Sequence, residues 1–317
     1  MLALLACVWP VGAGRASDSN SGGLREARER LDVLEQYSLP MREVSGLALA
    51  QGGADGIDIY AVGDADYEVG RFRTRESPHV VSIDVRDVAG AMSAGTQAVS
   101  QWEAVATDAS PMICALAEDS ARVTCLGGDL ARVVAEFELD VTNIPSLESS
   151  WSNEPNSRGE GMVLLRRGHV LLLKEKKPAL IIEFGPLGET PMGWSADSLL
   201  GDGQEFMTPA SHVLVALKVW ELADSLAAIA DDGSELAVGP DRRLYMLSQK
   251  SALLIRLEST LRPDEDKVHA SALWQLPHDF EHAEGLAIDG GMHPWVAVDN
   301  HETDRPNLFR LTPIEPR

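Results

Sequence analysis

A four-residue motif recurs along the chain, and three of its five copies begin with glutamate. The copies are Ser45-Gly-Leu-Ala48, Glu103-Ala-Val-Ala106, Glu160-Gly-Met-Val163, Ser234-Glu-Leu-Ala237 and Glu284-Gly-Leu-Ala287. A second polar position follows fifteen residues after the last four starts, at Glu118, Glu175, Gln249 and Asp299, and nineteen residues after the first, at Asp64. The starts lie about 60 residues apart on average, so the chain contains an internal repeat.

Carboxylates gathered at one opening cannot all stay ionised without a compensating positive charge, because like charges raise one another's pKa. The matching positions carry oxygen ligands and neither His nor Cys, which favours a hard cation, and Ca²⁺ tolerates irregular geometry better than Mg²⁺. The sequence therefore predicts a Ca²⁺ site drawn from Glu103, Glu160, Glu284, Glu118, Glu175, Asp299, Asp64, Glu43 and Asp232. The alternative is that some of these acids cap strand ends or accept hydrogen bonds from backbone N–H groups.

Short apolar runs separated by turn residues predict the strands that position these acids. The runs that end near the second polar position are Ile59–Val62, Ile113–Leu116, Val170–Leu173, Leu244–Leu247 and Trp295–Val298. Each is followed by a third run, at Val80–Ile83, Val123–Cys125, Leu180–Ile182, Leu253–Ile255 and Leu308–Leu311. Four-stranded meanders at this period predict an all-β fold, a five-bladed β-propeller.

The propeller geometry explains the spacing. The second strand of a blade runs antiparallel to the first, so its end returns to the rim where the first began. We therefore expect Glu103 beside Glu118, Glu160 beside Glu175, Glu284 beside Asp299 and Ser45 beside Asp64. Glu43 and Asp232, each two residues before a motif start, can join this ring. The position after each motif start lies near the propeller axis, where neighbouring blades crowd together and small residues fit. Four copies carry a small residue there, at Gly46, Ala104, Gly161 and Gly285, whereas Glu235 departs from this pattern.

The last motif is followed by too few residues for a complete blade, and the N-terminal part supplies the missing strand. Residues 31–40 end in Tyr37-Ser-Leu-Pro40, much as Val268–Pro277 ends in Trp274-Gln-Leu-Pro277. We expect residues 31–40 to pair with the last blade and close the ring, which removes exposed sheet edges. Two alternatives stay open: a sixth, degenerate blade within Leu187–Asp232, and a chance repeat in a β-sandwich.

The net charge and the N-terminal segment limit the possible partners and the possible location of the protein. Asp and Glu total 49 against 27 Lys and Arg, a formal charge of -22, which argues against nucleic acid and anionic lipid surfaces as partners. Residues 1–23 read as a signal peptide, or as a lipoprotein leader with a lipid on Cys7 as the only membrane attachment. Residues 24–317 then form one exported propeller domain, located in the periplasm, secreted or anchored at the cell envelope.

The remaining candidate residues have weaker signals. Cys114 and Cys125 flank the turn of a predicted hairpin, where either a disulfide or two small buried thiols would fit. Lys174, Lys176 and Lys177 indicate a solvated turn, with anion binding near the rim as the alternative. His278 and His282 lie in a predicted loop and lack the setting of a zinc site.

The chain resembles the SdiA-regulated family of bacterial propellers, and more loosely the esterase-like phytase and NHL-type propellers. The similarity lies in Gly159-Glu-Gly-Met162 with Leu173–Pro178, Leu236–Asp241 with Leu244–Ser248, and Ala283–Ala287 with Asn307–Phe309. The resemblance implies a five-bladed propeller without an established reaction. Related propellers use a channel Glu in a Glu-Gly context as a Ca²⁺ ligand, which Glu160 and Glu284 match, whereas Glu103 lacks the Gly, and Ser45 and Ser234 replace Glu.

Two functions follow as hypotheses. The first is a binding module of the cell envelope that holds Ca²⁺ and presents its channel mouth to a small ligand or an envelope protein. The alternative is a Ca²⁺-dependent hydrolase of phosphate esters or lactones, in which a spare carboxylate acts as the base. No Gly-x-Ser-x-Gly or His-Glu-x-x-His sequence occurs, so serine-hydrolase and zincin chemistry have no support.

Overall fold

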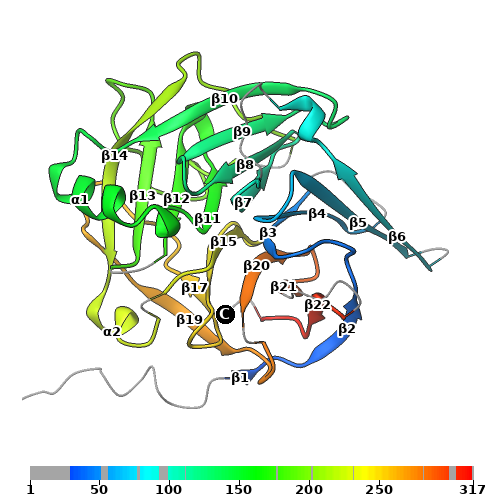
Figure 1. Cartoon of the computed structure of the whole chain (residues 1–317). Helices are drawn as coiled ribbons and strands as arrows, with labels where there is room; N and C mark the ends of the chain where they lie inside the picture. The colour runs from blue at the N-terminus through cyan, green and yellow to red at the C-terminus, as the bar shows by residue number, and fades with distance from the viewer. Residues whose placement is uncertain are drawn as a thin grey trace, which may run out of the picture.

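The computed structural model is built almost entirely of antiparallel strands arranged around an axis (Figure 1). It describes residues 29–50, 56–76, 79–92, 99–110, 112–175, 178–200, 203–230, 232–280, 282–299 and 305–315. Within these residues no helix has the length and apolar character needed to cross a membrane. The two α-helices of the described chain are α1 (Pro145–Asn153) and α2 (Asp224–Ala227).

The described strands form five four-stranded meanders, of which the second and third are joined edge to edge in one continuous sheet. The first is β3 (Val44–Leu49), β4 (Asp58–Gly63), β5 (Glu68–Glu76) and β6 (His79–Asp87). The second is β7 (Trp102–Thr107), β8 (Ile113–Ala117), β9 (Arg122–Leu126) and β10 (Val133–Asp140). The third is β11 (Gly161–Leu164), β12 (Val170–Lys174), β13 (Leu180–Gly185) and β14 (Val213–Leu222).

The last two meanders follow the same plan. The fourth is β15 (Glu235–Val238), β16 (Leu244–Ser248), β17 (Leu253–Leu257) and β19 (Ala270–Gln275). The fifth is β20 (Ala283–Ile288), β21 (Pro294–Val298), β22 (Leu308–Leu311) and the N-terminal β2 (Val33–Tyr37). Two short strands, β1 (Glu29–Arg30) and β18 (Lys267–Val268), pair in parallel with β19 and β14.

The meanders close into a ring. The innermost strands contact one another in the order β3, β7, β11, β15 and β20, and β20 returns to β3. The described apolar core divides in the same way, because each of five buried clusters lies between two consecutive meanders. This arrangement confirms the predicted β-propeller. The described part of Leu187–Asp232 supplies β14 and α2 and no further meander.

The predicted ring closure is confirmed. Strand β2 pairs antiparallel with β22, from Val33 opposite Leu311 to Tyr37 opposite Leu308. The buried Asn307 side chain fastens the junction, since its Oδ1 accepts the Leu39 N–H at 2.7 Å and its Nδ2 donates to the Leu39 carbonyl at 3.0 Å. The ends of the described chain are therefore held together by backbone pairing and by one satisfied buried amide.

One predicted strand was misplaced. Val80–Ile83 was expected as the third strand of the first meander, but it belongs to β6, the outermost strand, and the third strand is β5. The apolar-run criterion missed β5 because Arg71 and Arg73 alternate with its buried residues. A strand that is apolar on one face only shows alternation and not a continuous run.

The structure decides the alternatives left open for the two internal cysteines. Cys114 in β8 and Cys125 in β9 lie directly opposite each other in the antiparallel ladder, and their sulfur atoms form a disulfide. Both residues are fully buried in the cluster between the second and third meanders. The disulfide therefore cross-links two neighbouring strands inside the core.

Candidate functional site

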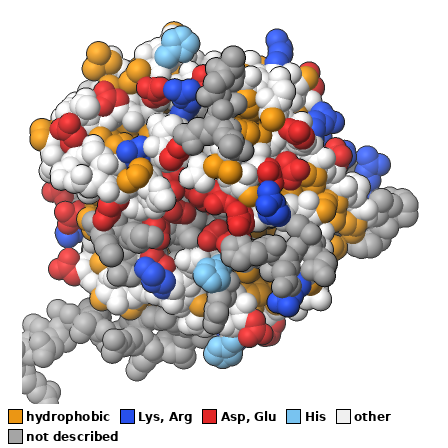
Figure 2. Space-filling view, in the orientation of Figure 1, with side chains coloured by type: hydrophobic (Ala, Val, Ile, Leu, Met, Phe, Trp, Pro, Cys, Tyr) orange, Lys and Arg blue, Asp and Glu red, His pale blue; other side chains and the backbone are white. Residues whose placement is uncertain are grey.

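The motif starts and their partners meet at one mouth of the channel, as the repeat predicted. All nine carboxylates expected there line a single cavity of about 440 Å³: Glu43, Asp64, Glu103, Glu118, Glu160, Glu175, Asp232, Glu284 and Asp299. We call this cavity the acidic mouth. Figure 2 shows acidic side chains gathered near the centre of this face. Among the described residues lining the cavity there is no Lys or Arg, so no basic side chain of the lining balances the charge.

Three corners of the acidic mouth share one local backbone structure. Glu43, Gln101 and His282 each adopt a positive φ, between 51° and 65°, two residues before a motif start. A β-bulge follows each of them, where the register shifts within β3, β7 and β20. The carbonyls of these three residues accept the N–H groups of Asp64, Glu118 and Asp299. Bulges of this kind re-aim side chains, and here they turn both members of each pair toward the cavity.

Burial changes the protonation of this cluster. Burial raises the pKa of Glu103 to about 7, and the nearby charge of Asp64 adds to the effect. Burial likewise raises the pKa of Glu284 to about 9, helped by Asp299, and that of Asp64 to about 6, helped by a hydrogen bond with Glu43. The pKa of Glu160 rises well above its usual value for the same reason. Several carboxyl groups of the mouth therefore hold protons near neutral pH.

Polar neighbours distinguish the members of the ring. Gln249 donates its Nε2 to Glu284 Oε1 at 3.0 Å, at the corner where the fourth motif carries no second acid. Asp232 lines the cavity, but its Oδ1 accepts the Ser248 hydroxyl at 2.7 Å and its Oδ2 accepts the Lys250 N–H at 2.8 Å. Asp232 thus performs the capping role that the sequence left as an alternative for some of these acids.

The acidic mouth is not arranged as a closed coordination shell. Within the described residues no group of three or more His, Cys, Asp or Glu side chains has the arrangement of a metal site. The carboxylates line a shared cavity instead. Side chains that border a cavity can reorient around a cation, so the donor set fits a hard metal by its chemistry.

Glu235, the residue that departs from the small-residue pattern, closes the channel beneath the acidic mouth. Its carboxylate accepts the N–H of Leu236 at 2.9 Å and of Leu47 at 3.3 Å, and it also accepts the N–H groups of Met162 and Leu286. These donors belong to four of the five innermost strands, so the carboxylate lies at the axis. The side chain is fully buried, and burial raises its pKa well above the usual value.

The small residues at the equivalent position leave room for this arrangement. A Cβ on Gly161 would lie 2.2 Å from the backbone nitrogen of Leu236, and one on Gly285 would lie 3.1 Å from that of Leu47. The strands therefore approach one another as backbone at the axis, and their N–H groups converge there. No described residue lines both the acidic mouth and the cavity on the other side of Glu235.

Two predictions for the lysines have different outcomes. Lys174 was expected in a solvated turn, and this is wrong: it ends β12 with a fully buried side chain, and its Nζ lies 3.6 Å from Glu154 Oε2. The surrounding sheet buries its aliphatic part, and the acid balances its charge. Lys176 and Lys177 lie outside the described residues, and so does the N-terminal segment with Cys7.

Sequence reasoning missed several residues of the mouth. Gln101, Asn156 and His282 line the cavity beside the carboxylates. Gln101 and His282 occupy the same repeat position as Glu43, two residues before a motif start, so the repeat itself contained the signal. Asn156 comes from the connection between α1 and β11, outside the repeat, and only the tertiary structure brings it to the mouth.

Comparisons with known proteins show fold-level likeness only. No protein-family model matches the chain, and no curated protein matches it. A streptogramin B lyase structure aligns at 11% identity and a TM-score of 0.46, covering 89% of this chain and 97% of that one. The glutaminyl cyclase of Myxococcus xanthus aligns at 10% identity and a TM-score of 0.45, covering 90% and 98%. A gluconolactonase from Xanthomonas campestris aligns at 12% and 0.41, covering 87% and 79%. Likenesses this weak carry no argument about activity.

Proposed function

We propose that this propeller is a binding module of the cell envelope whose acidic mouth holds a divalent cation, Ca²⁺, and presents it to a ligand or protein partner. The observation that carries the proposal is nine carboxylates lining one cavity, with no Lys or Arg among the described residues of its lining. Burial first, and neighbouring carboxylates second, raise the pKa values of Glu103, Glu284 and Asp64, which is the cost of ionising this cluster. A bound cation would relieve it by favouring the ionised forms.

Cation binding of this kind must displace protons. Glu103, with a pKa of about 7, and Glu284, with a pKa of about 9, are wholly or partly protonated at pH 7. Metal ligands of this type bind in the carboxylate form, so affinity rises with pH while these groups lose their protons. We expect Ca²⁺ to bind more tightly at pH 8 than at pH 6. We also expect its binding to release protons from the carboxyl groups of the acidic mouth.

Calorimetric titration of chelator-treated protein with Ca²⁺ tests the proposal. Glu284→Gln keeps the shape of the protonated side chain but removes its ability to ionise, and it should weaken Ca²⁺ binding by about tenfold or more. The matched control is Glu148→Gln on the exposed face of α1, away from the cavity, which should bind as the native chain does. Titrations in buffers of different ionisation enthalpy count the released protons. Absence of binding heat in the native protein, or equal affinity in both variants, would contradict a cation site.

A second candidate is a Ca²⁺-dependent hydrolase of phosphate esters or lactones. The observation that favours it is Glu103, because a carboxyl group with a pKa of about 7 can act as a general base at physiological pH. The cation would supply polarisation of the substrate. Turnover of p-nitrophenyl phosphate or dihydrocoumarin that requires Ca²⁺, stops with chelator and is lost in Glu160→Gln would establish this function in place of simple binding.

Export belongs to the same proposal, as does membership of the SdiA-regulated family. The Cys114–Cys125 disulfide supports export, since disulfides persist in oxidising compartments. The motifs around Glu160 and Glu284 are the basis for the family. Mass spectrometry of the N-terminus of the isolated protein would distinguish cleavage of a leader from lipid attachment at Cys7. An unprocessed N-terminus on protein recovered from the cytoplasm would contradict export.

A further inference from the structure

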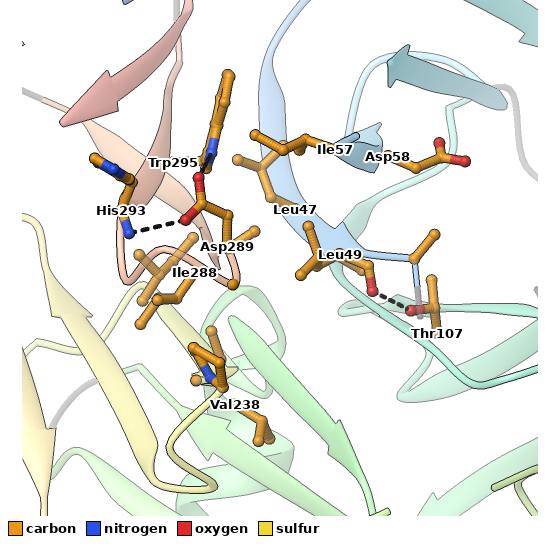
Figure 3. Close-up of a pocket in the computed structure, with 18 of the residues that line it drawn as sticks. Leu47, Leu49, Ile57, Asp58, Thr107, Val238, Ile288, Asp289, His293 and Trp295 are labelled. Atoms are coloured by element: carbon orange, nitrogen blue, oxygen red, sulfur yellow. Dashed lines mark hydrogen bonds between the residues drawn. The ribbon is translucent and has the colours of Figure 1, made fainter. Parts of the chain in front are cut away.

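The opposite end of the channel holds a second cavity with a different character. It encloses about 1790 Å³, roughly four times the volume of the acidic mouth, and it lies where the innermost strands end. Figure 3 shows its wall, with Leu47, Leu49, Val238 and Ile288 contributed by three different innermost strands. We call it the second mouth. Its size exceeds the range of about 300–1,000 Å³ usual for small-molecule sites.

A row of arginines borders the second mouth. Arg71, Arg73 and Arg75 occupy alternate positions of β5, so their side chains leave the same face of that strand. Arg71 is held by Asp58 in β4 through two bonds, Nε to Oδ1 at 2.9 Å and an Nη to Oδ2 at 2.5 Å. Within the described residues Arg73 and Arg75 form no ion pair and no side-chain hydrogen bond. As far as the described part of the chain shows, these two guanidinium groups are available to an external anion.

Every acid of this lining is already matched by described partners. Asp58 is engaged with Arg71, and Glu35 accepts an Nη of Arg310 at 2.8 Å. Asp289 accepts the N–H of His293 at 3.0 Å and the indole Nε1 of Trp295 at 3.1 Å, as Figure 3 shows. Asp58 lies opposite Arg73 in the β4–β5 ladder, but its two oxygens bond Arg71, so none of these three acids forms a hydrogen bond with Arg73 or Arg75.

The other basic groups of the lining are also engaged. The guanidinium of Arg242 donates to the carbonyls of Leu199 and Leu200, each at 2.8 Å. Burial lowers the pKa of His293, which keeps its ring neutral at pH 7. In a chain with an excess of 22 negative charges, Arg73 and Arg75 thus line the cavity without an ion-pair partner among the described residues.

Two buried polar atoms near Arg73 and Arg75 also indicate that a partner binds at this place. Arg73 Nε and Tyr60 Oη are both shielded from solvent without a hydrogen-bond partner among the described residues. The charge of Arg73 acts on the Tyr60 hydroxyl, so the two groups are neighbours. Buried polar atoms in proteins nearly always have a partner. Because Arg73 lines the second mouth, although Tyr60 does not, ordered solvent or a ligand in that cavity could supply a partner for Arg73.

We propose that the second mouth binds an amphipathic organic anion, with its charged head at Arg73 and Arg75 and its apolar body against the ends of the innermost strands. Carboxylate and phosphate heads share the chemistry that arginine recognises. The apolar wall excludes a bare inorganic ion as the best ligand, because such an ion would leave that surface without a partner. This site is separate from the acidic mouth, since Glu235 lies between them and no described residue lines both.

Two dyes with the same ring system test the proposal on the full-length protein. 1-Anilinonaphthalene-8-sulfonate carries an anionic head, and N-phenyl-1-naphthylamine is its uncharged counterpart. We expect the anionic dye to bind with enhanced fluorescence, and the paired change Arg73→Gln with Arg75→Gln to weaken it by about tenfold. The neutral dye should keep its affinity within about twofold, because the apolar wall is unchanged.

The controls separate local charge from global effects. Arg132→Gln with Arg262→Gln alters the net charge by the same amount at exposed positions outside the lining, and it should leave both dyes unaffected. Arg73→Lys with Arg75→Lys retains the charges and should keep most of the affinity, so the test holds even if the glutamine pair folds poorly. Octanoate and octyl phosphate should displace the anionic dye better than octanol, and their ranking identifies the preferred head.

The same titrations can overturn the proposal. No binding of the anionic dye to the native protein, equal losses for both dyes, or equal losses in the distant arginine pair would each contradict it. Displacement by octanol as strong as by octanoate would do the same. Repeating the titration with Ca²⁺ and with chelator should give the same affinity, so failure of this site and failure of the acidic mouth are distinguishable.

Discussion

The two mouths of the channel are built from opposite ends of the same innermost strands, yet they hold charge in opposite ways. At the acidic mouth carboxylates face carboxylates, and burial raises the pKa of Glu103, Glu160 and Glu284. At the second mouth each lining acid has a cation or several N–H donors. The comparison shows that a propeller can place its mutually repelling, buried carboxyl groups at one end of its axis. A ligand of opposite charge is expected at that end.

Glu235 keeps these two environments apart, and its removal is expected to have the largest effect. Glu235→Ala would leave four N–H groups at the axis without their acceptor and would join the two cavities. We expect the free energy of unfolding to fall by at least about 3 kcal/mol, because buried donors without partners cost about 1–3 kcal/mol each. Denaturant unfolding followed by tryptophan fluorescence measures this, with Glu148→Ala as the control. A loss below about 1 kcal/mol would mean that the carboxylate is not the acceptor for these donors.

The pH dependence of stability should differ with and without Ca²⁺. The folded-state pKa values of Glu103 and Glu284, about 7 and about 9, exceed the value of 4.5 for a free carboxyl group. The folded state therefore binds more protons than the unfolded state between pH 4.5 and 9, and stability falls as pH rises through this window, by about 1.4 kcal/mol per pH unit for each retained proton.

Thermal unfolding from pH 5 to pH 9 measures this slope. We expect the melting temperature of chelated protein to decrease steadily over that range, and Ca²⁺ to remove much of the decrease because it binds the ionised form. Glu103→Gln should flatten the slope without Ca²⁺, since that position no longer titrates. A cation-independent slope would show that the acidic mouth is tuned by its own hydrogen bonds and not by a metal.

The smallest expected effect concerns Asp58 at the second mouth. Asp58→Asn would release Arg71 from its ion pair and add a third available guanidinium to the row. We expect affinity for the anionic dye to increase by about two- to threefold and stability to fall by less than about 1 kcal/mol, because the pair is partly exposed. Fluorescence titration beside the native protein checks this. A decrease in affinity would indicate that Asp58 positions Arg71 for the ligand.

Repeat spacing alone determined the ring of acids and the closure of the fold. A distance of fifteen residues from Glu103 to Glu118, from Glu160 to Glu175 and from Glu284 to Asp299 spans one antiparallel hairpin, so it places both side chains at one rim whatever the details of packing. The pairing of β2 with β22 followed from the missing last strand in the same way. These features depend on local chain geometry, which the sequence expresses directly.

Only the tertiary structure decided how individual charges are held. Asp232 accepts capping hydrogen bonds, and Lys174 is buried beside Glu154. Glu235 accepts hydrogen bonds from N–H groups of four different strands. Arg73 and Arg75 were left facing a cavity that no single strand defines. The physical reason is that the free energy of a charge depends on every group within a few Å, and those groups come from parts of the chain far apart in sequence.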